Sequence, residues 1–292
     1  MKDTLDTSSA LPEKIVQEID DIPPLPSIVV KVMQLIRDPE STAKQLTDVI
    51  SQDQALTGNI LRLCNSSYYG LPRVVSSLSQ AIMYLGFHTV RNLVLTCSIS
   101  KLFSPDKKVY GYKKGGLWYH AVVCALTCQI ISKKIKPDIA DAAFTAGLLH
   151  DIGQLVMAII IKDTAETIVD LMESNNISDL KAERETVGFS HDELGAALAN
   201  KWNFPDELVH AIRFHHTPEA SKNKSILTAI VNLADAIVLE LGYGVQLDQM
   251  KHPASSYALK IAKIDEELYN SLRDAAEEQI SQFASQFIAI ED

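Results

Sequence analysis

The sequence of 292 residues has few cysteines, no run of basic residues and almost no alternation of apolar with polar residues. Its four cysteines include no pair separated by two residues, and a disulfide-stapled mini-protein is excluded. Acidic residues number 37 and basic residues 27, and the formal charge of −10 argues against a general nucleic-acid-binding protein. Because strand patterns are nearly absent and 47% of the residues are hydrophobic, a globular helical protein is predicted.

The sequence also lacks the features of a secreted or membrane-spanning protein. Its first 14 residues mix acidic with polar residues and have no apolar core of the signal-peptide kind. The longest uncharged stretch, residues 115–132, contains His120 and other polar residues, which favours a buried helix over a membrane span. We therefore expect a cytoplasmic protein that makes no membrane contact and keeps its cysteines reduced.

Cys124 and Cys128 lie four residues apart in this stretch and are neighbours on one face of the predicted helix. One interpretation makes them weak metal ligands. The other makes them packing residues, since a free cysteine behaves as a small hydrophobic side chain. We favour packing.

Helical spacing of apolar residues predicts an all-α fold in two packed helical subdomains. The predicted helices cover residues 27–37, 41–51, 54–65, 77–85, 88–103, 117–135, 139–161, 165–175, 190–202, 205–216, 225–241 and 264–288. The predicted domain organisation is a flexible leader, an amino-terminal subdomain, a carboxyl-terminal subdomain and a helical extension, over residues 1–20, 21–110, 111–245 and 246–292.

Histidines and aspartates in the second subdomain form the pattern that carries chemistry. His120 and Asp235 are polar residues inside apolar helices, and His150 and Asp151 are adjacent in the string GLLHDIG. A buried carboxylate needs a metal ion or a paired base. Imidazole and carboxylate ligands suit divalent zinc, iron, manganese or nickel.

Three further histidines belong to the same pattern. Ser190 and Glu193 have the spacing of a capping box, which predicts that a helix begins there with His191 in its first turn. His215 and His216 close the next predicted helix. Because adjacent helical residues point about 100° apart, His150 and Asp151 can share an ion only if it lies off the helix axis between them.

The order His120, His150-Asp151, Asp235 resembles the H…HD…D pattern of the HD superfamily of metal phosphohydrolases. A closer resemblance is to HDOD, the HD-related output domain of bacterial signalling, over about residues 20–240. The strings that support it are IPPLPS, SQDQALTGNILRLCNSSYYG, SLSQAIMYLGFHTVRNLVL, AFTAGLLHDIGQLVM, HDELGAALANKWNFP and AIRFHH. The resemblance implies that residues 111–245 form an HD-like helical bundle.

The resemblance also implies a ligand set and residue roles. The first ion would be bound by His120, His150, Asp151 and Asp235, with Asp151 able to bridge to a second ion. His191 and His215 would bind that second ion, with His216 as a ligand or in its outer shell. The bound metal would activate a water against phosphorus, with Asp151 in the catalytic centre and Arg213, or else Lys201, neutralising phosphate charge.

The sequence departs from the active HD-GYP branch, which cleaves cyclic di-GMP. Gln154 stands where that branch has a lysine, Gly116 stands where it has a carboxylate, and no GYP segment follows His216. HDOD proteins are regarded as signalling or regulatory modules. We therefore expect a bacterial regulatory protein that acts by binding a signalling partner or a nucleotide ligand. It would retain a mono- or dinuclear divalent metal site, with iron, manganese, zinc or nickel as the metal. The alternative is a metal-dependent phosphohydrolase acting on a nucleotide or cyclic dinucleotide.

Overall fold

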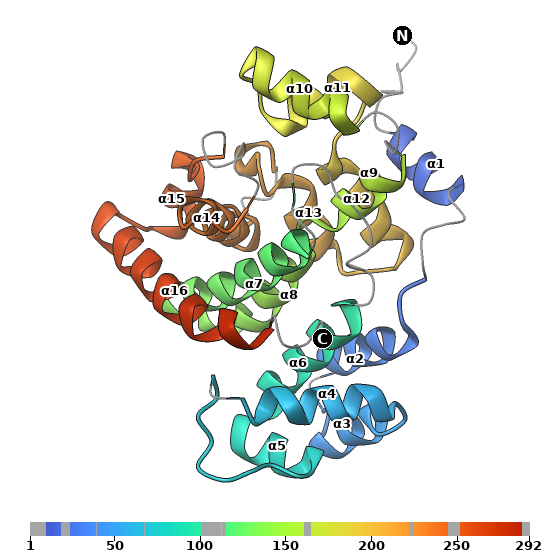
Figure 1. Ribbon diagram of the computed structural model, residues 1–292, viewed down its shortest axis with the longest axis vertical. Coiled ribbons are helices and arrows are strands. Elements are labelled where there is room, and N and C mark those ends of the chain that lie inside the picture. The colour runs from blue at the N-terminus through green and yellow to red at the C-terminus, as the bar shows by residue number, and fades with distance from the viewer. Residues whose placement is uncertain are drawn as a thin grey trace. The chain divides into compact units, whose positions relative to one another are not determined.

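The computed structural model describes residues 10–18, 24–38, 40–66, 68–100, 112, 115–160, 165–221, 225–244 and 252–287, and all of its regular elements there are helical. This confirms the predicted all-α fold. The chain divides into two compact units (Figure 1). The large unit comprises residues 1–23 and 103–276, and the small unit comprises residues 24–102 and 277–292.

The small unit is built around one largely buried helix. Its helices are α2 (Ser27–Arg37), α3 (Ala43–Ile50), α4 (Gln54–Cys64), α5 (Leu78–Leu85) and α6 (Phe87–Ile99). Side-chain oxygens of Thr42, Asp53 and Ser77 cap α3, α4 and α5, which explains where these helices begin. Helix α6 is buried from Val90 to its end and packs against the other four helices.

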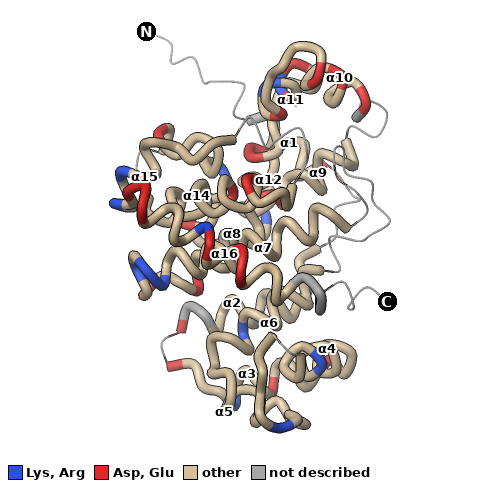
Figure 2. Tube along the Cα trace, turned by 60° about the vertical axis from the view of Figure 1, so that its left-hand side comes forward, with Lys and Arg blue, Asp and Glu red and all other residues tan. Residues whose placement is uncertain are grey.

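The large unit contains the predicted histidine and aspartate pattern. Its helices are α1 (Ala10–Glu18), α7 (Gly116–Ile135), α8 (Ala140–Leu149), α9 (Ile152–Ile160), α10 (Ala165–Asn175), α11 (Asp179–Val187), α12 (His191–Lys201), α13 (Asp206–Phe214), α14 (Ile226–Glu240), α15 (Ser256–Ala262) and the first half of α16 (Glu266–Phe287). Helices α7, α8 and α14 pack together and form its apolar centre. Charged residues gather on other elements, such as α10, α11 and α16 (Figure 2).

The structure of the large unit differs from the sequence-based prediction in three places. Residues 10–18 lie inside the expected flexible leader but form α1, which packs on α12, and Lys201 Nζ donates to the Val16 carbonyl at 2.7 Å. Helices α11 and α15 were not predicted, because α11 is mostly polar and α15, with seven residues, is too short to show apolar periodicity. The single helix expected over 139–161 is interrupted at His150 and Asp151, which form a turn between α8 and α9.

Two glycines beside this turn allow neighbouring helices to approach it. A Cβ on Gly147 would lie 2.9 Å from the Cys124 carbonyl oxygen of α7, and a Cβ on Gly153 would lie 1.8 Å from the His191 carbonyl oxygen of α12. Only glycine leaves space for both contacts. The GLLHDIG string therefore places α7 and α12 directly against the His150-Asp151 turn.

One described stretch, Pro137–Ile160, passes a length and hydropathy test for a membrane span. Its most apolar window is 83% buried inside the fold, and its helix is interrupted at the turn. Burial of this kind is typical of a core helix.

Candidate metal centre

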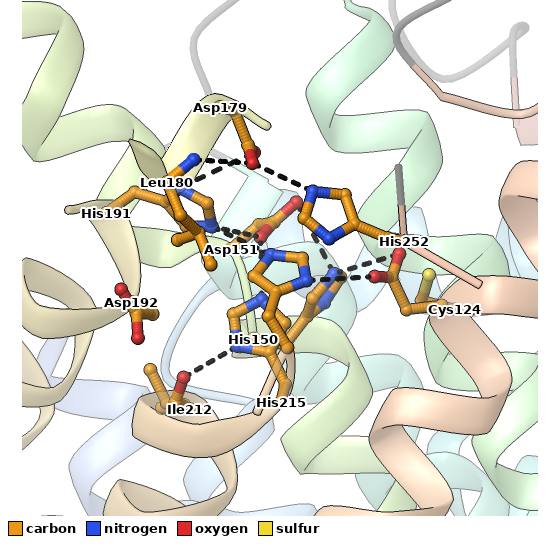
Figure 3. A network of polar contacts seen from close by, with 12 residues as sticks. Cys124, His150, Asp151, Asp179, Leu180, His191, Asp192, Ile212, His215 and His252 are labelled. Carbon is orange, nitrogen blue, oxygen red and sulfur yellow. Dashed lines mark hydrogen bonds and ion pairs between the residues drawn. The ribbon is translucent and has the colours of Figure 1, made fainter. Parts of the chain in front are cut away.

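Seven predicted ligand residues meet around Asp151 in the interior of the large unit. His120 is on α7, His191 begins α12, Asp235 is on α14, and His215 with His216 follows α13. All seven side chains are at most 6% exposed. Figure 3 shows imidazoles from separate elements pointing at the Asp151 carboxylate.

The two oxygens of Asp151 face different pairs of histidines. Asp151 Oδ2 lies 3.6 Å from His120 Nε2 and 3.4 Å from His150 Nε2. Asp151 Oδ1 lies 3.5 Å from His191 Nε2 and 3.4 Å from His215 Nε2. A carboxylate in this position can bridge two ions.

Asp235 contacts the first pair from α14. Its Oδ1 lies 3.2 Å from His120 Nε2 and 3.8 Å from His150 Nε2. Its Oδ2 lies 3.7 Å from His216 Nδ1, and His216 Nε2 lies 3.1 Å from His191 Nε2. His216 therefore lies between the two groups of ligand atoms.

Hydrogen bonds at Nδ1 orient the histidines. His120, His150 and His215 donate from Nδ1 to the carbonyls of Tyr243, Gly147 and Ile212 at 2.6, 2.8 and 2.7 Å. A carbonyl only accepts, so Nδ1 of each ring carries a hydrogen, and in the neutral ring the lone pair lies on Nε2, which faces the cluster. A hydrogen bond from the second ring nitrogen is the usual support of a metal-bound histidine.

Several buried atoms of the cluster have no hydrogen-bond partner. These atoms are His150 Nε2, Asp151 Oδ1, His215 Nε2 and His216 Nδ1. Each such atom lowers the free energy of unfolding by about 1–3 kcal/mol if it stays without a partner. In a tetrahedral zinc site with bonds of about 2.1 Å, neighbouring ligand atoms lie about 3.4 Å apart. The observed separations bracket that value, and we conclude that the residues fit a divalent metal.

The charges of the cluster suit metal binding at neutral pH. Burial lowers the pKa of His150 to about 4, which leaves its imidazole neutral. Burial opposes ionisation of Asp151, yet His150 and the other histidines hold the pKa of this carboxyl well below its usual value. Burial also opposes the charge of His191, but Glu183 raises its pKa well above the usual value. A bound dication would compete with that proton.

A second layer of residues, which the sequence pattern missed, supports the centre. Glu183 accepts from His191 Nδ1 at 2.9 Å and from the His191 backbone N–H at 2.7 Å. Asp179 lies 2.8 Å from His252 Nε2, and that ring stacks on His216 at 4.0 Å. Although burial acts against ionisation, His252 holds the pKa of Asp179 at about 2.

These supporting residues differ in how visible they are in the sequence. Asp179 and Glu183 are four apart on one face of α11, and a paired-carboxylate search along the helix would have found them. His252 belongs to no described helix, and its sequence gives no signal. Tyr112, whose hydroxyl donates to Asp151 Oδ2 at 3.4 Å, precedes α7 by three residues and was also missed.

The predicted phosphate-binding cations are bonded elsewhere. Arg213 pairs with Asp192, and its Nη2 lies 2.8 Å from Glu193 Oε1. The Glu193 carboxylate also accepts from the Ser190 N–H at 3.0 Å, which confirms the capping box. The structure does not bring Arg213 or Lys201 into the described contacts of the seven-residue cluster.

The chain matches known proteins over most of its length. A family model of the HDOD domain matches residues 22–218. The crystal structure of an HDOD domain protein of unknown function from Geobacter sulfurreducens is 27% identical, with a TM-score of 0.77 over 94% of this chain and 98% of that one. A Shewanella amazonensis SB2B structure described as a candidate phosphohydrolase is 25% identical, with a TM-score of 0.66 over 91% and 97%.

Curated relatives match over smaller shares of their own length. A Geobacter sulfurreducens ribonuclease Y is 30% identical over 54% of this chain and 24% of its own. A Treponema pallidum (strain Nichols) protein of uncharacterized function is 26% identical over 86% of this chain and 48% of its own. The chain thus spans half or less of these relatives. The family match covers both units and the cluster up to residue 218, and the chain belongs to the HDOD family.

Proposed function

We propose that this chain is a cytoplasmic regulatory protein of bacterial signalling whose large unit contains a buried dinuclear metal centre. The observation that carries the proposal is the Asp151 carboxylate, whose two oxygens face two separate histidine pairs. The unpartnered buried nitrogens of His150 and His215 support it, because each lone pair needs a partner. The metal would link α7, α12 and α14 to the His150-Asp151 turn and to His215 and His216, which follow α13.

The donor set limits the metal. Imidazole and carboxylate donors suit zinc, iron, manganese and nickel, and we expect one of these. In a hydrolytic site the metal would lower the pKa of a bound water and polarise a phosphoryl group. This chain's own residues would hold each ion in place and exclude bulk water.

Two features favour regulation over turnover. Gln154, at the position of the lysine in the HD-GYP branch, is 3% exposed and neutral. Arg213 is paired with Asp192 and Glu193. A phosphoryl substrate would therefore lack both the lysine of the HD-GYP branch and the cation expected from Arg213. A signalling protein or a nucleotide would act as the partner of the loaded form.

Elemental analysis of protein purified without chelator tests the metal centre. We expect bound metal in the wild type, loss in His150→Ala and retention in His88→Ala, since His88 lies on α6 of the small unit. Wild-type protein that contains no metal, and binds none when manganese, iron or zinc is added, would refute the proposal.

The bridging position of Asp151 also favours a second candidate function, hydrolysis of a phosphate ester of a nucleotide or cyclic dinucleotide. A phosphatase and phosphodiesterase screen with iron or manganese distinguishes the two. Turnover that disappears in Asp151→Ala would establish hydrolysis and displace the regulatory proposal. Metal-loaded protein without turnover on these substrates would leave regulation as the function.

A further inference from the structure

Cys124 lies against the first group of ligand atoms. It follows His120 by one helical turn on α7, and its Sγ is 3.6 Å from His120 Nε2. The side chain is 1% exposed. Figure 3 shows its sulfur among the sticks of the cluster, on the side away from His191.

The position of this sulfur fits a metal ligand. With bonds of about 2.1 Å to nitrogen and 2.3 Å to sulfur, a tetrahedral ion separates the two ligand atoms by about 3.6 Å. Cys124 Sγ lies 3.6 Å from His120 Nε2 and 4.0 Å from His120 Nδ1, and only Nε2 is open to an ion because Nδ1 donates to the Tyr243 carbonyl. Ligand atoms of His120, Cys124, His150 and Asp235 all lie within 4.8 Å of one another. The His150 Nε2 atom has no hydrogen-bond partner, which independently points to a missing ligand.

Cys128, one turn further along α7, has a different environment. It is 0% exposed, and its Sγ lies 2.7 Å from the position that a Cβ on Gly147 would occupy. It belongs to none of the described groups of candidate ligands. Cys128 therefore packs against α8, whereas Cys124 faces the cluster.

We propose that Cys124 is a thiolate ligand of the ion bound by His120, His150 and Asp235. The inference rests on the proposed metal centre and adds a sulfur donor to one side of it. On binding, the metal–sulfur bond forms, the S–H bond breaks and the proton passes to water. A thiolate favours zinc, iron(II) or cobalt(II) over magnesium and manganese, so the two halves of the centre differ in metal preference.

Cobalt(II) titration of the full chain, after removal of metal with a chelator, tests this assignment. A thiolate bound to cobalt gives an intense charge-transfer band in the near ultraviolet, and imidazole and carboxylate do not. We expect the band in the wild type and in Cys128→Ser, and its loss in Cys124→Ser. Affinity for zinc should fall about 10–100-fold or more in Cys124→Ser and stay within twofold in Cys128→Ser.

Each outcome decides the assignment. Cobalt that binds to the wild type without the band, or a band that persists in Cys124→Ser, would overturn the Cys124 ligand and leave the metal centre intact. Wild type that binds no cobalt would overturn both. If Cys124→Ser loses its helical circular dichroism, the variant is unfolded and cannot be used. X-ray absorption spectroscopy of the zinc-loaded wild type then tests the ligand instead. A sulfur neighbour at about 2.3 Å supports the proposal, and its absence refutes it.

Discussion

Replacement of the bridging carboxylate is the most direct test of the centre. Asp151→Asn keeps the size of the side chain and removes its charge. Four histidine nitrogens lie 3.4–3.6 Å from the two Asp151 oxygens, two on each side. Asp235 Oδ1 faces only the first pair. We therefore expect Asp151→Asn to weaken both ions, and Asp235→Asn to weaken chiefly the first.

The magnitude follows from the burial of the charge. Removing one partner of a buried ionic contact costs about 3–5 kcal/mol, which is roughly a 10²- to 10⁴-fold loss of metal affinity. Metal at 100 times its Kd stabilises a protein by about 2.7 kcal/mol. In a domain of about 150–250 residues, that raises Tm by about 5–10 °C.

Thermal unfolding with and without manganese or zinc measures this effect. The wild type should show the full rise in Tm, Asp151→Asn almost none and Asp235→Asn part of it. Asp206→Asn, at an exposed position on α13, is the matched control and should behave as the wild type. An Asp151→Asn variant with the wild-type shift in Tm and two bound ions would refute the bridging role.

Three further predictions concern the surroundings of the centre. Glu183→Gln, which alters the partner of His191 Nδ1, should lower metal affinity about 10–100-fold by calorimetric titration. Gly153→Ala should destabilise the fold by about 3 kcal/mol or more in urea unfolding, because its Cβ would meet a backbone oxygen. Gly58→Ala, whose Cβ would meet nothing, should stabilise it by about 0.4–1 kcal/mol. In chelated protein, the stability advantage of wild type over Asp179→Asn should be about 2 kcal/mol at neutral pH. Because the folded pKa is lowered from 3.8 to about 2, this advantage should be lost as the pH falls through that interval.

The residues that meet in the centre were predictable because they interrupt apolar helices. His120 and Asp235 are polar positions in sequences that otherwise predict core, and burial of such residues requires a partner. The break at His150 and Asp151 was not predictable, since GLLHDIG continues an apolar helical pattern. The break depends on the close contacts with α7 and α12 that Gly147 and Gly153 make possible.

The two cysteines of α7 show why ligand and packing roles cannot be separated by spacing alone. Cys124 and Cys128 are equally apolar in context and share one helix face. Cys128 lies against Gly147 near the end of α8, whereas Cys124 lies beside His120 and the cluster. The difference depends on what packs against each turn of α7. That information belongs to the tertiary structure. The same holds for His252, which reaches Asp179 from 73 residues away in the chain.

The charges of the centre favour regulation over phosphoryl chemistry. In the proposed centre, with neutral imidazoles, the anionic ligands would be Asp151, Asp235 and the Cys124 thiolate. Glu183 would add a fourth negative charge behind His191, and Asp179 is paired with His252. These four negative charges would balance two bound dications. A phosphate monoester carries about −1.5 to −2 at neutral pH, and a balanced centre has little excess positive charge to attract it. Gln154 adds none. Before loading, the Cys124 thiol keeps its proton and the raised pKa of His191 favours a charged imidazole, so loading would exchange protons for metal ions inside the large unit. The free energy of binding would stabilise the fold around the proposed centre, where a partner would detect it.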